Sequence, residues 1–213
     1  MANDGPTALE RFWNGILPEN PVYRQLLGMC PVLAVTNSMQ NAVTMAGAVM
    51  FVLICANALT SMIRGLLKPH LRILVFTLTI ATFVTIADRV LAAYLYTTSK
   101  SLGPFIPLII VNCLIICRCE VCSSKQGIVT SVSDAIGQSL GFGLGLASMA
   151  FVRELLATGG VWGQSWFWNT PATEQYRWGL MGLPPGAFFT LGILLALVNW
   201  YVESRERKLK LKK

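Results

Sequence analysis

The chain has 213 residues, of which 54% are hydrophobic and 13% are charged, and its formal net charge is +7. Because the charged residues gather between long uncharged runs, this composition indicates a polytopic membrane protein and excludes a separate soluble domain. The positive charge does not indicate nucleic-acid binding, since most of it flanks apolar segments and is explained by membrane topology. Basic residues lie in the tail at Arg205, Arg207, Lys208, Lys210, Lys212 and Lys213, and in one loop at Arg64, Lys68 and Arg72.

The first part of the chain is predicted to contain a broken apolar segment. Residues 1–20 are expected to form a short surface lead-in. The stretch 21–37 is apolar, but it is interrupted at Gly28 and Pro31, and it carries Cys30. A helix that crosses a bilayer needs about 20 apolar residues. We therefore predict a half-membrane segment here, with Cys30 inside it.

Two membrane-spanning helices are predicted next. Residues 42–63 are uncharged throughout and form the clearest span. A basic turn follows, and residues 73–96 form the second span. The adjacent charges Asp88 and Arg89 lie far enough along it to reach the opposite interface, where we expect them to pair.

A second broken apolar segment is predicted at residues 103–118. Its apolar run ends at Arg118, fourteen residues after Pro104, and it carries Cys113. This run is too short to cross a bilayer, so it is predicted to be another half-membrane segment. A polar turn is expected to follow it, up to Lys125.

The last part of the chain is predicted to add two more spans. The first, 135–152, has glycines four residues apart on one helical face, which is typical of close helix packing. Residues 153–185 are rich in tryptophan and are expected to form a loop lying on the membrane interface. The second span covers 186–202, and the basic tail 203–213 follows. The glycines are Gly137, Gly141 and Gly145.

These six apolar elements predict an all-α polytopic membrane protein built from two inverted three-helix repeats, 21–99 and 100–202. Each repeat begins with a broken half-membrane segment, the usual sign of a functional site near the midplane. Three crossings per repeat are an odd number, so the repeats must run in opposite directions. Cys30 and Cys113, 83 residues apart, then face each other. The basic loops and tail place both termini in the cytoplasm.

Two facing thiols at membrane depth indicate a soft metal site. A thiolate is costly in hydrocarbon, and soft thiolates select iron–sulfur clusters, zinc or copper(I). Two cysteines do not complete a four-thiolate site, so the other ligands must come from this chain or from a partner. The local candidates are Cys113, Cys117, Cys119 and Cys122. One continuous helix cannot gather all four around a metal, and buried cysteine is also common as a small apolar residue, as for Cys55.

Other functions fit parts of the pattern. An inverted-repeat secondary transporter would share the broken helices. A membrane thiol–disulfide oxidoreductase would use exchanging thiols, and Cys119 and Cys122 have the usual spacing.

The carboxylates closest to membrane depth are Asp88 and Asp134. We expect both to be structural, the first paired at the interface and the second at a helix N-terminus.

Three stretches carry a resemblance to a known family: LLGMCPVLAVTNS, ICANALTSMIR and GPFIPLIIVNCLIICRCEVCSSKQG. With the order of helices around them, they resemble the RnfE/NqrD family of the Rnf and sodium-pumping NADH:quinone oxidoreductase complexes, from about Glu10 to Val202. The resemblance implies pairing with a homologous subunit of opposite orientation, RnfA-like or NqrE-like. Each subunit would supply two cysteines to one shared 2Fe-2S cluster, and the matching positions here are Cys30 and Cys113.

The resemblance also implies a function. The chain would be one membrane subunit of an ion-pumping ferredoxin:NAD oxidoreductase complex in the bacterial inner membrane. It would relay electrons across the bilayer, with no catalytic residue of its own and with flavin and further iron–sulfur centres on other subunits. The complex would translocate Na⁺ or H⁺. Cys117, Cys119 and Cys122 depart from the family pattern, where Gly or Ala is often found.

Overall fold

The computed structural model describes residues 8–16, 19–65, 69–94, 96–123, 126–158, 160–162, 164–165 and 182–210. The long helices are α3 (Met39–Ile63), α4 (Arg72–Tyr94), α7 (Ile128–Thr158) and α9 (Pro184–Lys210). The short helices are α1 (Ala8–Ile16), α2 (Met29–Val35), α5 (Tyr96–Leu102) and α6 (Cys113–Arg118). Single turns are η1 (Pro69–Leu71) and η2 (Ile106–Ile109), and a π-helical turn, η3 (Cys119–Ser123), continues α6. Strands β1 (Gly160–Val161) and β2 (Gln164–Ser165) form an antiparallel pair.

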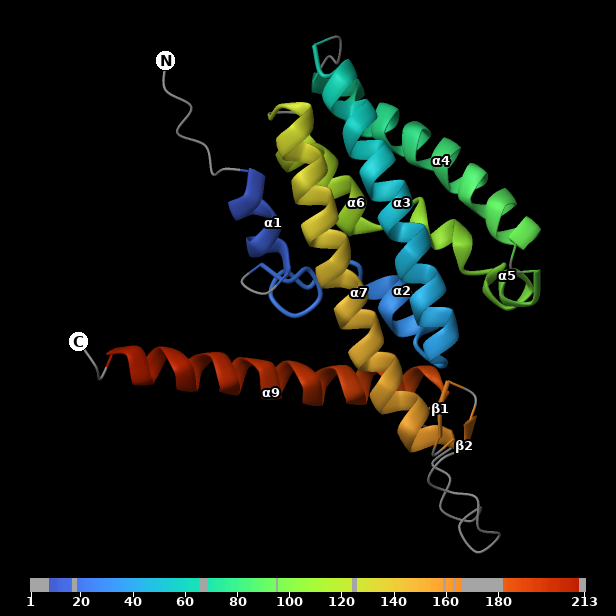
Figure 1. The fold of residues 1–213 in the computed structure, drawn as a ribbon, viewed down its shortest axis with the longest axis vertical. Coiled ribbons are helices and arrows are strands. Elements are labelled where there is room, and N and C mark those ends of the chain that lie inside the picture. The colour runs from blue at the N-terminus through green and yellow to red at the C-terminus, as the bar shows by residue number, and fades with distance from the viewer. Residues whose placement is uncertain are drawn as a thin grey trace, which may run out of the picture.

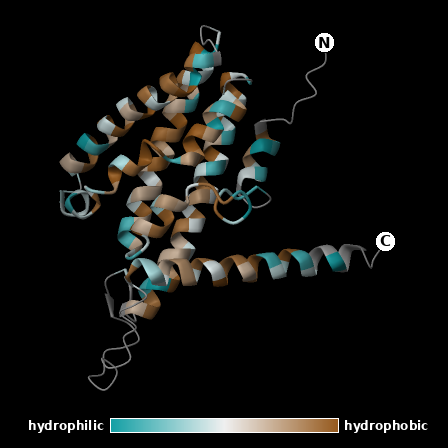
Figure 2. Ribbon diagram, turned by 180° about the vertical axis from the view of Figure 1, so that it is seen from behind, coloured by the Kyte–Doolittle hydropathy of each residue, from teal (hydrophilic) through white to brown (hydrophobic). Residues whose placement is uncertain are grey.

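The chain is a multi-pass membrane protein. Among the residues that the structure describes, five segments are long and apolar enough to cross a bilayer: Met39–Ile63, Arg72–Tyr94, Ile106–Ser123, Ile128–Ala157 and Pro184–Ser204. Figure 2 shows hydrophobic residues along most of these helices, whereas hydrophilic ones become frequent towards the end of α9. The predicted spans 42–63 and 73–96 are confirmed as α3 and α4, with ends that differ by at most three residues.

The antiparallel pair of α3 and α7 forms the centre of the fold (Figure 1). At one end, the Ser61 hydroxyl donates to the Gln126 carbonyl at 3.1 Å. At the other end, the Met39 amide donates to the Glu154 carboxylate at 2.7 Å. Because the start of each helix lies beside the end of the other, the two run in opposite directions. A short helix followed by two long ones occurs twice, as α2, α3 and α4 and as α6, α7 and α9.

The glycine face of α7 receives α1. A Cβ built on Gly15 would lie 2.7 Å from the backbone of Gly137, and one on Gly137 would lie 2.5 Å from the Phe12 carbonyl. No larger residue fits at these two positions without moving a backbone, so the close-packing role predicted for the glycines is confirmed. Residues 8–16 of the expected surface lead-in therefore form a helix packed along α7.

The chain is interrupted at both predicted places, but the prediction that the second segment is too short to cross a bilayer is wrong, because η2, α6 and η3 together form the crossing-capable stretch Ile106–Ser123. α2 has seven residues, a length of about 10 Å at 1.5 Å per residue, and an irregular stretch precedes it. α6 begins after a turn at residues 110–112 and continues through η3. The polar turn expected from Arg118 is wrong, since Arg118 is buried at the end of α6 and Cys119–Ser123 remain helical. The helix continues because the charge of Arg118 is neutralised inside the protein.

The C-terminal part also differs from the prediction. α7 extends from Ile128 to Thr158, well beyond the predicted 135–152, and Arg153 is buried inside it instead of starting a loop. Trp162 lies in the exposed turn between β1 and β2, while the other tryptophans of the predicted interfacial loop lie outside the described residues. α9 starts beside α2 and the end of α7 and then extends away from the bundle (Figure 1). Most of its later apolar side chains are exposed, for example Trp200.

Candidate functional site

The structure brings the two cysteine-bearing segments together. Cys30 is the second residue of α2, and Cys113 is the first residue of α6. The amide of Gly28, two residues before Cys30, donates to the Cys113 sulfur at 3.0 Å. The entry to one short helix therefore contacts the cysteine of the other, although 85 residues separate Gly28 from Cys113.

The local geometry at this contact depends on two residues. Gly28 has φ of 75°, in the left-handed region that favours glycine, and a Cβ there would lie 2.7 Å from the Phe142 ring. Asn112 caps α6, because its side-chain oxygen accepts from the Leu114 amide at 3.0 Å. A glycine and an N-cap thus start the two short helices, and each lies within two residues of a cysteine.

A second contact joins the same two segments. The Arg118 guanidinium at the end of α6 donates to the Gln25 side chain, in the stretch before α2, at 2.7 Å. It also lies 3.6 Å from a carboxylate oxygen of Asp134. Both members of this ion pair are buried, with side chains 6% and 1% exposed. The buried pair on α6 and α7 thereby holds the stretch that leads to Cys30.

The exposure of the thiols separates Cys30 and Cys113 from the other four cysteines. Both are exposed and free, whereas Cys55 and Cys117 are half-buried. Cys119 and Cys122 are buried. The Cys119 thiol donates to the Asn57 side-chain oxygen at 3.3 Å. Among the six cysteines, all of which the structure describes, the two exposed thiols are therefore those at the two helix starts.

Within the described residues, the cysteines of the run from Cys113 to Cys122 do not come together as a group of possible metal ligands. Across the part of the chain that the structure describes, no three His, Cys, Asp or Glu side chains lie close enough together to hold a metal ion. Cys113 faces the surface while Cys119 and Cys122 are inside the protein. Cys30 and Cys113 can thus supply two thiolates, and completing a site requires ligands from outside the described residues.

The structure corrects two interpretations of the acidic residues. Asp134 is the seventh residue of α7 and pairs with Arg118, so it does not serve the helix N-terminus. Asp88 and Arg89 form no ion pair with each other, among the ion pairs of the described residues. Adjacent residues on a helix do not face each other, which explains why the expected pair is missing.

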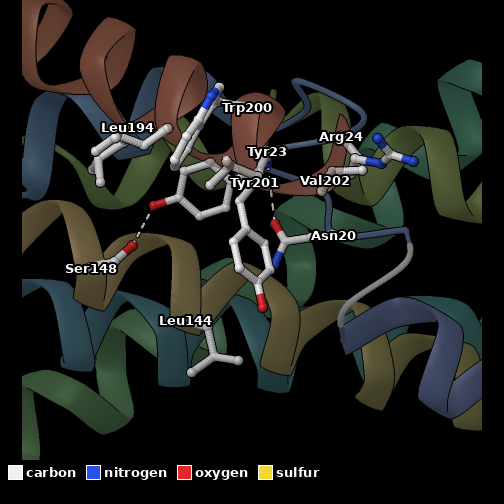
Figure 3. Close-up of a pocket in the computed structure, with 11 residues that line it drawn as sticks. Asn20, Tyr23, Arg24, Leu144, Ser148, Leu194, Trp200, Tyr201 and Val202 are labelled. Atoms are coloured by element: carbon white, nitrogen blue, oxygen red, sulfur yellow. Dashed lines mark hydrogen bonds between the residues drawn. The ribbon is translucent and has the colours of Figure 1, made fainter. Parts of the chain in front are cut away.

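An apolar groove of about 850 Å³ lies elsewhere, between the stretch before α2, α7 and α9 (Figure 3). Tyr23 and Ser148 share a hydrogen bond in its wall. Its lining contains neither Cys30 nor Cys113 and no carboxylate. Its other lining residues are Asn20, Arg24, Leu144, Leu194, Leu197, Val198, Trp200, Tyr201 and Val202. The cysteine pair, and not this groove, is the candidate redox site.

Comparison with known proteins identifies the family of the chain. A family model described as an Rnf-Nqr subunit and membrane protein matches residues 8–195. The chain belongs to the Rnf-Nqr family. It is 44% identical over 192 residues to the subunit designated E in the Na⁺-translocating ferredoxin:NAD⁺ oxidoreductase complex of Acetobacterium woodii, covering 90% of this chain and 96% of the relative.

Other relatives of this Rnf-Nqr chain cover it as fully, and both carry the same letter in their complexes. The relative from the proton-translocating ferredoxin:NAD⁺ oxidoreductase complex of Clostridium ljungdahlii is 35% identical over 211 residues, which is 96% of either protein. The relative from an ion-translocating oxidoreductase complex of Methanosarcina acetivorans is 38% identical over 202 residues, which is 94% of either protein. The similarity thus extends over nearly the whole length of each relative.

Sequence reasoning missed the residues that hold the two short helices in place. Arg118 and Arg153 were interpreted as the ends of apolar segments, because a charge usually marks the membrane boundary. Arg153 nevertheless continues the four-residue spacing of the glycine face, through Gly145 and Met149. That spacing places Arg153 on the packed face of α7, so the sequence alone could have predicted that Arg153 is buried.

Proposed function

We propose that this chain is a membrane subunit of an ion-translocating ferredoxin:NAD oxidoreductase complex, and that it relays electrons across the bilayer through a 2Fe-2S cluster shared with a homologous subunit. The relatives' names support the complex. The observation that carries the relay is the pair of exposed thiols, Cys30 and Cys113, at the starts of two adjoining short helices.

The donor set fits half of such a cluster. A 2Fe-2S cluster usually takes four thiolates and, when bound, supplies one-electron oxidation and reduction. This chain offers Cys30 and Cys113, and both sulfurs lie at its surface, where a second chain can reach them. The Gly28 amide donates to the Cys113 sulfur, a contact of the kind that sets the potential of iron–sulfur sites.

A homologous partner of opposite orientation, RnfA-like, would supply the other two thiolates. The repeated order of one short and two long helices, with α3 antiparallel to α7, supports an inverted repeat inside this chain. A partner built on the same plan presents the same pair of helix starts. Two such pairs across an interface complete a four-thiolate site.

The rest of the assembly follows from the same proposal. Both termini lie in the cytoplasm and the complex lies in the bacterial inner membrane, in agreement with the basic loop and tail. Other subunits carry flavin and further iron–sulfur centres, and this chain is not catalytic alone. The translocated ion is Na⁺ or H⁺, since the two relatives differ in the ion that their names give.

The thiol–disulfide alternative has less support. Exchange requires an accessible thiolate. Cys119 and Cys122, which have the spacing for it, are 0% and 1% exposed. No feature among the described residues favours this chemistry over the relay.

The decisive experiment replaces one thiol at a time in the whole complex. Cys30→Ser and Cys113→Ser should each abolish the paramagnetic signal of this cluster in the reduced, anaerobically purified complex, because hard oxygen replaces soft sulfur. Cys55→Ser is the matched control and should leave the signal intact, since Cys55 lies within the long helix α3 and on neither short helix. A normal signal in both ligand variants, with all subunits assembled, would refute the proposal.

A further inference from the structure

A buried arginine on α7 connects the ends of two other helices. Arg153 is 2% exposed. One of its terminal nitrogens donates to the Leu33 carbonyl at 3.3 Å and to the Thr36 hydroxyl at 2.7 Å. The other donates to the carbonyls of Gly182 and Leu183, just before α9, at 3.2 and 3.3 Å. The planar fork of a guanidinium suits two such separate sets of acceptors, and a single ammonium does not.

These bonds matter most for α2. The last four carbonyls of any helix lack partners within the helix, and in a seven-residue helix they are most of its carbonyls. Arg153 takes up one of them directly. The Thr36 hydroxyl, which accepts from Arg153, donates in turn to the Val32 carbonyl at 2.6 Å. The C-terminal end of α2 is therefore held by side chains and not by a continuing helix.

The neighbouring residue holds the next helix. The Glu154 carboxylate is buried and accepts from the Met39 amide, at the first residue of α3, at 2.7 Å. A cation beside a helix C-terminus and an anion beside a helix N-terminus each match the helix dipole. Consecutive residues of α7 thus fix the break between α2 and α3 from both sides.

We propose that Arg153 is the positioning residue for Cys30. Leu33, which Arg153 binds, lies about one helical turn after Cys30 in the same short helix, so a shift of that end moves Cys30 as well. Cys113 stands on α6, which Arg153 does not touch among the described contacts. Loss of the guanidinium therefore changes the placement of one thiol relative to the other. That these thiols are ligands rests on the proposed function.

The test compares Arg153→Lys with Arg89→Lys in the whole complex. Arg89 is exposed on α4, so the same chemical change there is the matched control. Two measurements are made. The first is the midpoint potential and line shape of the Cys30–Cys113 signal. The second is the ratio of maleimide labelling rates of Cys30 and Cys113 after iron has been removed from the complex.

Arg153→Lys should shift the potential, broaden the signal and change the labelling ratio several-fold, whereas Arg89→Lys should match the unmodified complex. Thr36→Val, which removes the hydroxyl between Arg153 and α2, should change the ratio in the same direction by less. If the Arg153→Lys complex does not assemble, the labelling ratio of the Thr36→Val complex tests whether Arg153 positions Cys30.

The inference would be overturned if an assembled Arg153→Lys complex kept both the labelling ratio and the potential of the unmodified complex. If that variant does not assemble, the same result in the Thr36→Val complex would overturn it. A complex that lacks any signal dependent on Cys30 and Cys113 would instead refute the proposed function. The labelling ratio would still measure the positioning in that case, so the two failures are distinguishable.

Discussion

α2 and α6 both carry a cysteine in their first turn, but different contacts hold them. α2 starts at a left-handed glycine without a side-chain cap, and Arg153 holds its far end. α6 starts at the Asn112 cap, and its far end continues into a π-helical turn in which Cys119, Cys122 and Ser123 are buried. Similar placement of two thiols is thus reached with different local chemistry. The cysteine therefore has the same position in α2 and in α6, whereas the contacts that hold each helix differ.

The largest expected effect tests whether the two helices supply equal halves of one site. This chain expressed without its partners should hold little or no iron, because two thiolates do not complete a four-thiolate cluster. The measurement is iron and acid-labile sulfide per chain, with the complex purified in the same way as control. Stoichiometric iron in the isolated chain would locate the metal in the run from Cys113 to Cys122. It would contradict the proposal that α2 and α6 each supply one thiolate to a shared site.

A second test removes the buried ion pair that holds the end of α6 and changes no residue of α2. Arg118→Met leaves the Asp134 carboxylate buried without its partner, and losing one member of a buried pair typically costs about 3–5 kcal/mol. Arg72→Met is the control, because its pair with Glu120 is partly exposed and should contribute at most about 1 kcal/mol. Thermal unfolding of the complex in detergent measures both.

The double variant Arg118→Met/Asp134→Leu sharpens this test. It removes both charges and should recover much of the lost stability, since an apolar pair can replace a buried ion pair. Equal losses in the Arg118 and Arg72 single variants would show that the buried pair does not hold α6.

Much of the fold was predictable from the sequence, and the reason lies in the solvent. Long uncharged runs predicted α3 and α4 closely, because a bilayer requires about 20 apolar residues per crossing. Gly28 and the prolines near Pro104 predicted the breaks. Cys30 and Cys113 lie at the starts of two short helices that are joined by the bond from the Gly28 amide to the Cys113 sulfur. That the two thiols face each other stays a prediction.

The helix ends were not predictable in the same way. Arg118 and Arg153 lie inside the protein because partners distant in the sequence accept from them, Gln25 and Leu33 respectively. A single sequence shows a charge but not the acceptor that it meets, so both arginines were taken as boundaries. The span predicted at 186–202 is confirmed as the apolar part of α9, Pro184–Ser204, although much of its apolar surface is exposed within this chain.

The start of α2 gives a third, more local test. Gly28→Ala places a side chain at φ of 75° and 2.7 Å from the Phe142 ring, and such strained backbone costs about 1–3 kcal/mol. The shifted amide should also weaken its bond to the Cys113 sulfur. Because that bond favours the more negative, reduced state, we expect a lower midpoint potential of the shared cluster in a redox titration.

Gly47→Ala is the matched control for this change. Nothing lies within 4 Å of a Cβ at Gly47, which lies within α3, so alanine there should be neutral or slightly stabilising. A potential that is equal in the two alanine variants would contradict the role of the Gly28 amide.

The smallest expected effect concerns the start of α6. Asn112→Ala removes the side-chain oxygen that accepts from the Leu114 amide, and loss of such a cap typically costs about 1 kcal/mol. Asn112→Asp keeps the acceptor and should retain most of the stability. Ser38→Ala is the control, because Ser38 occupies the same position before α3 without a side-chain cap bond and should change little. Thermal unfolding compares the stability of the three variants. The maleimide labelling rate of Cys113 should rise only in Asn112→Ala, because the first turn of α6 frays without its cap. Equal behaviour of Asn112→Ala and Ser38→Ala would mean that the cap does not hold Cys113, and that the Gly28 amide and the Arg118 pair hold it instead.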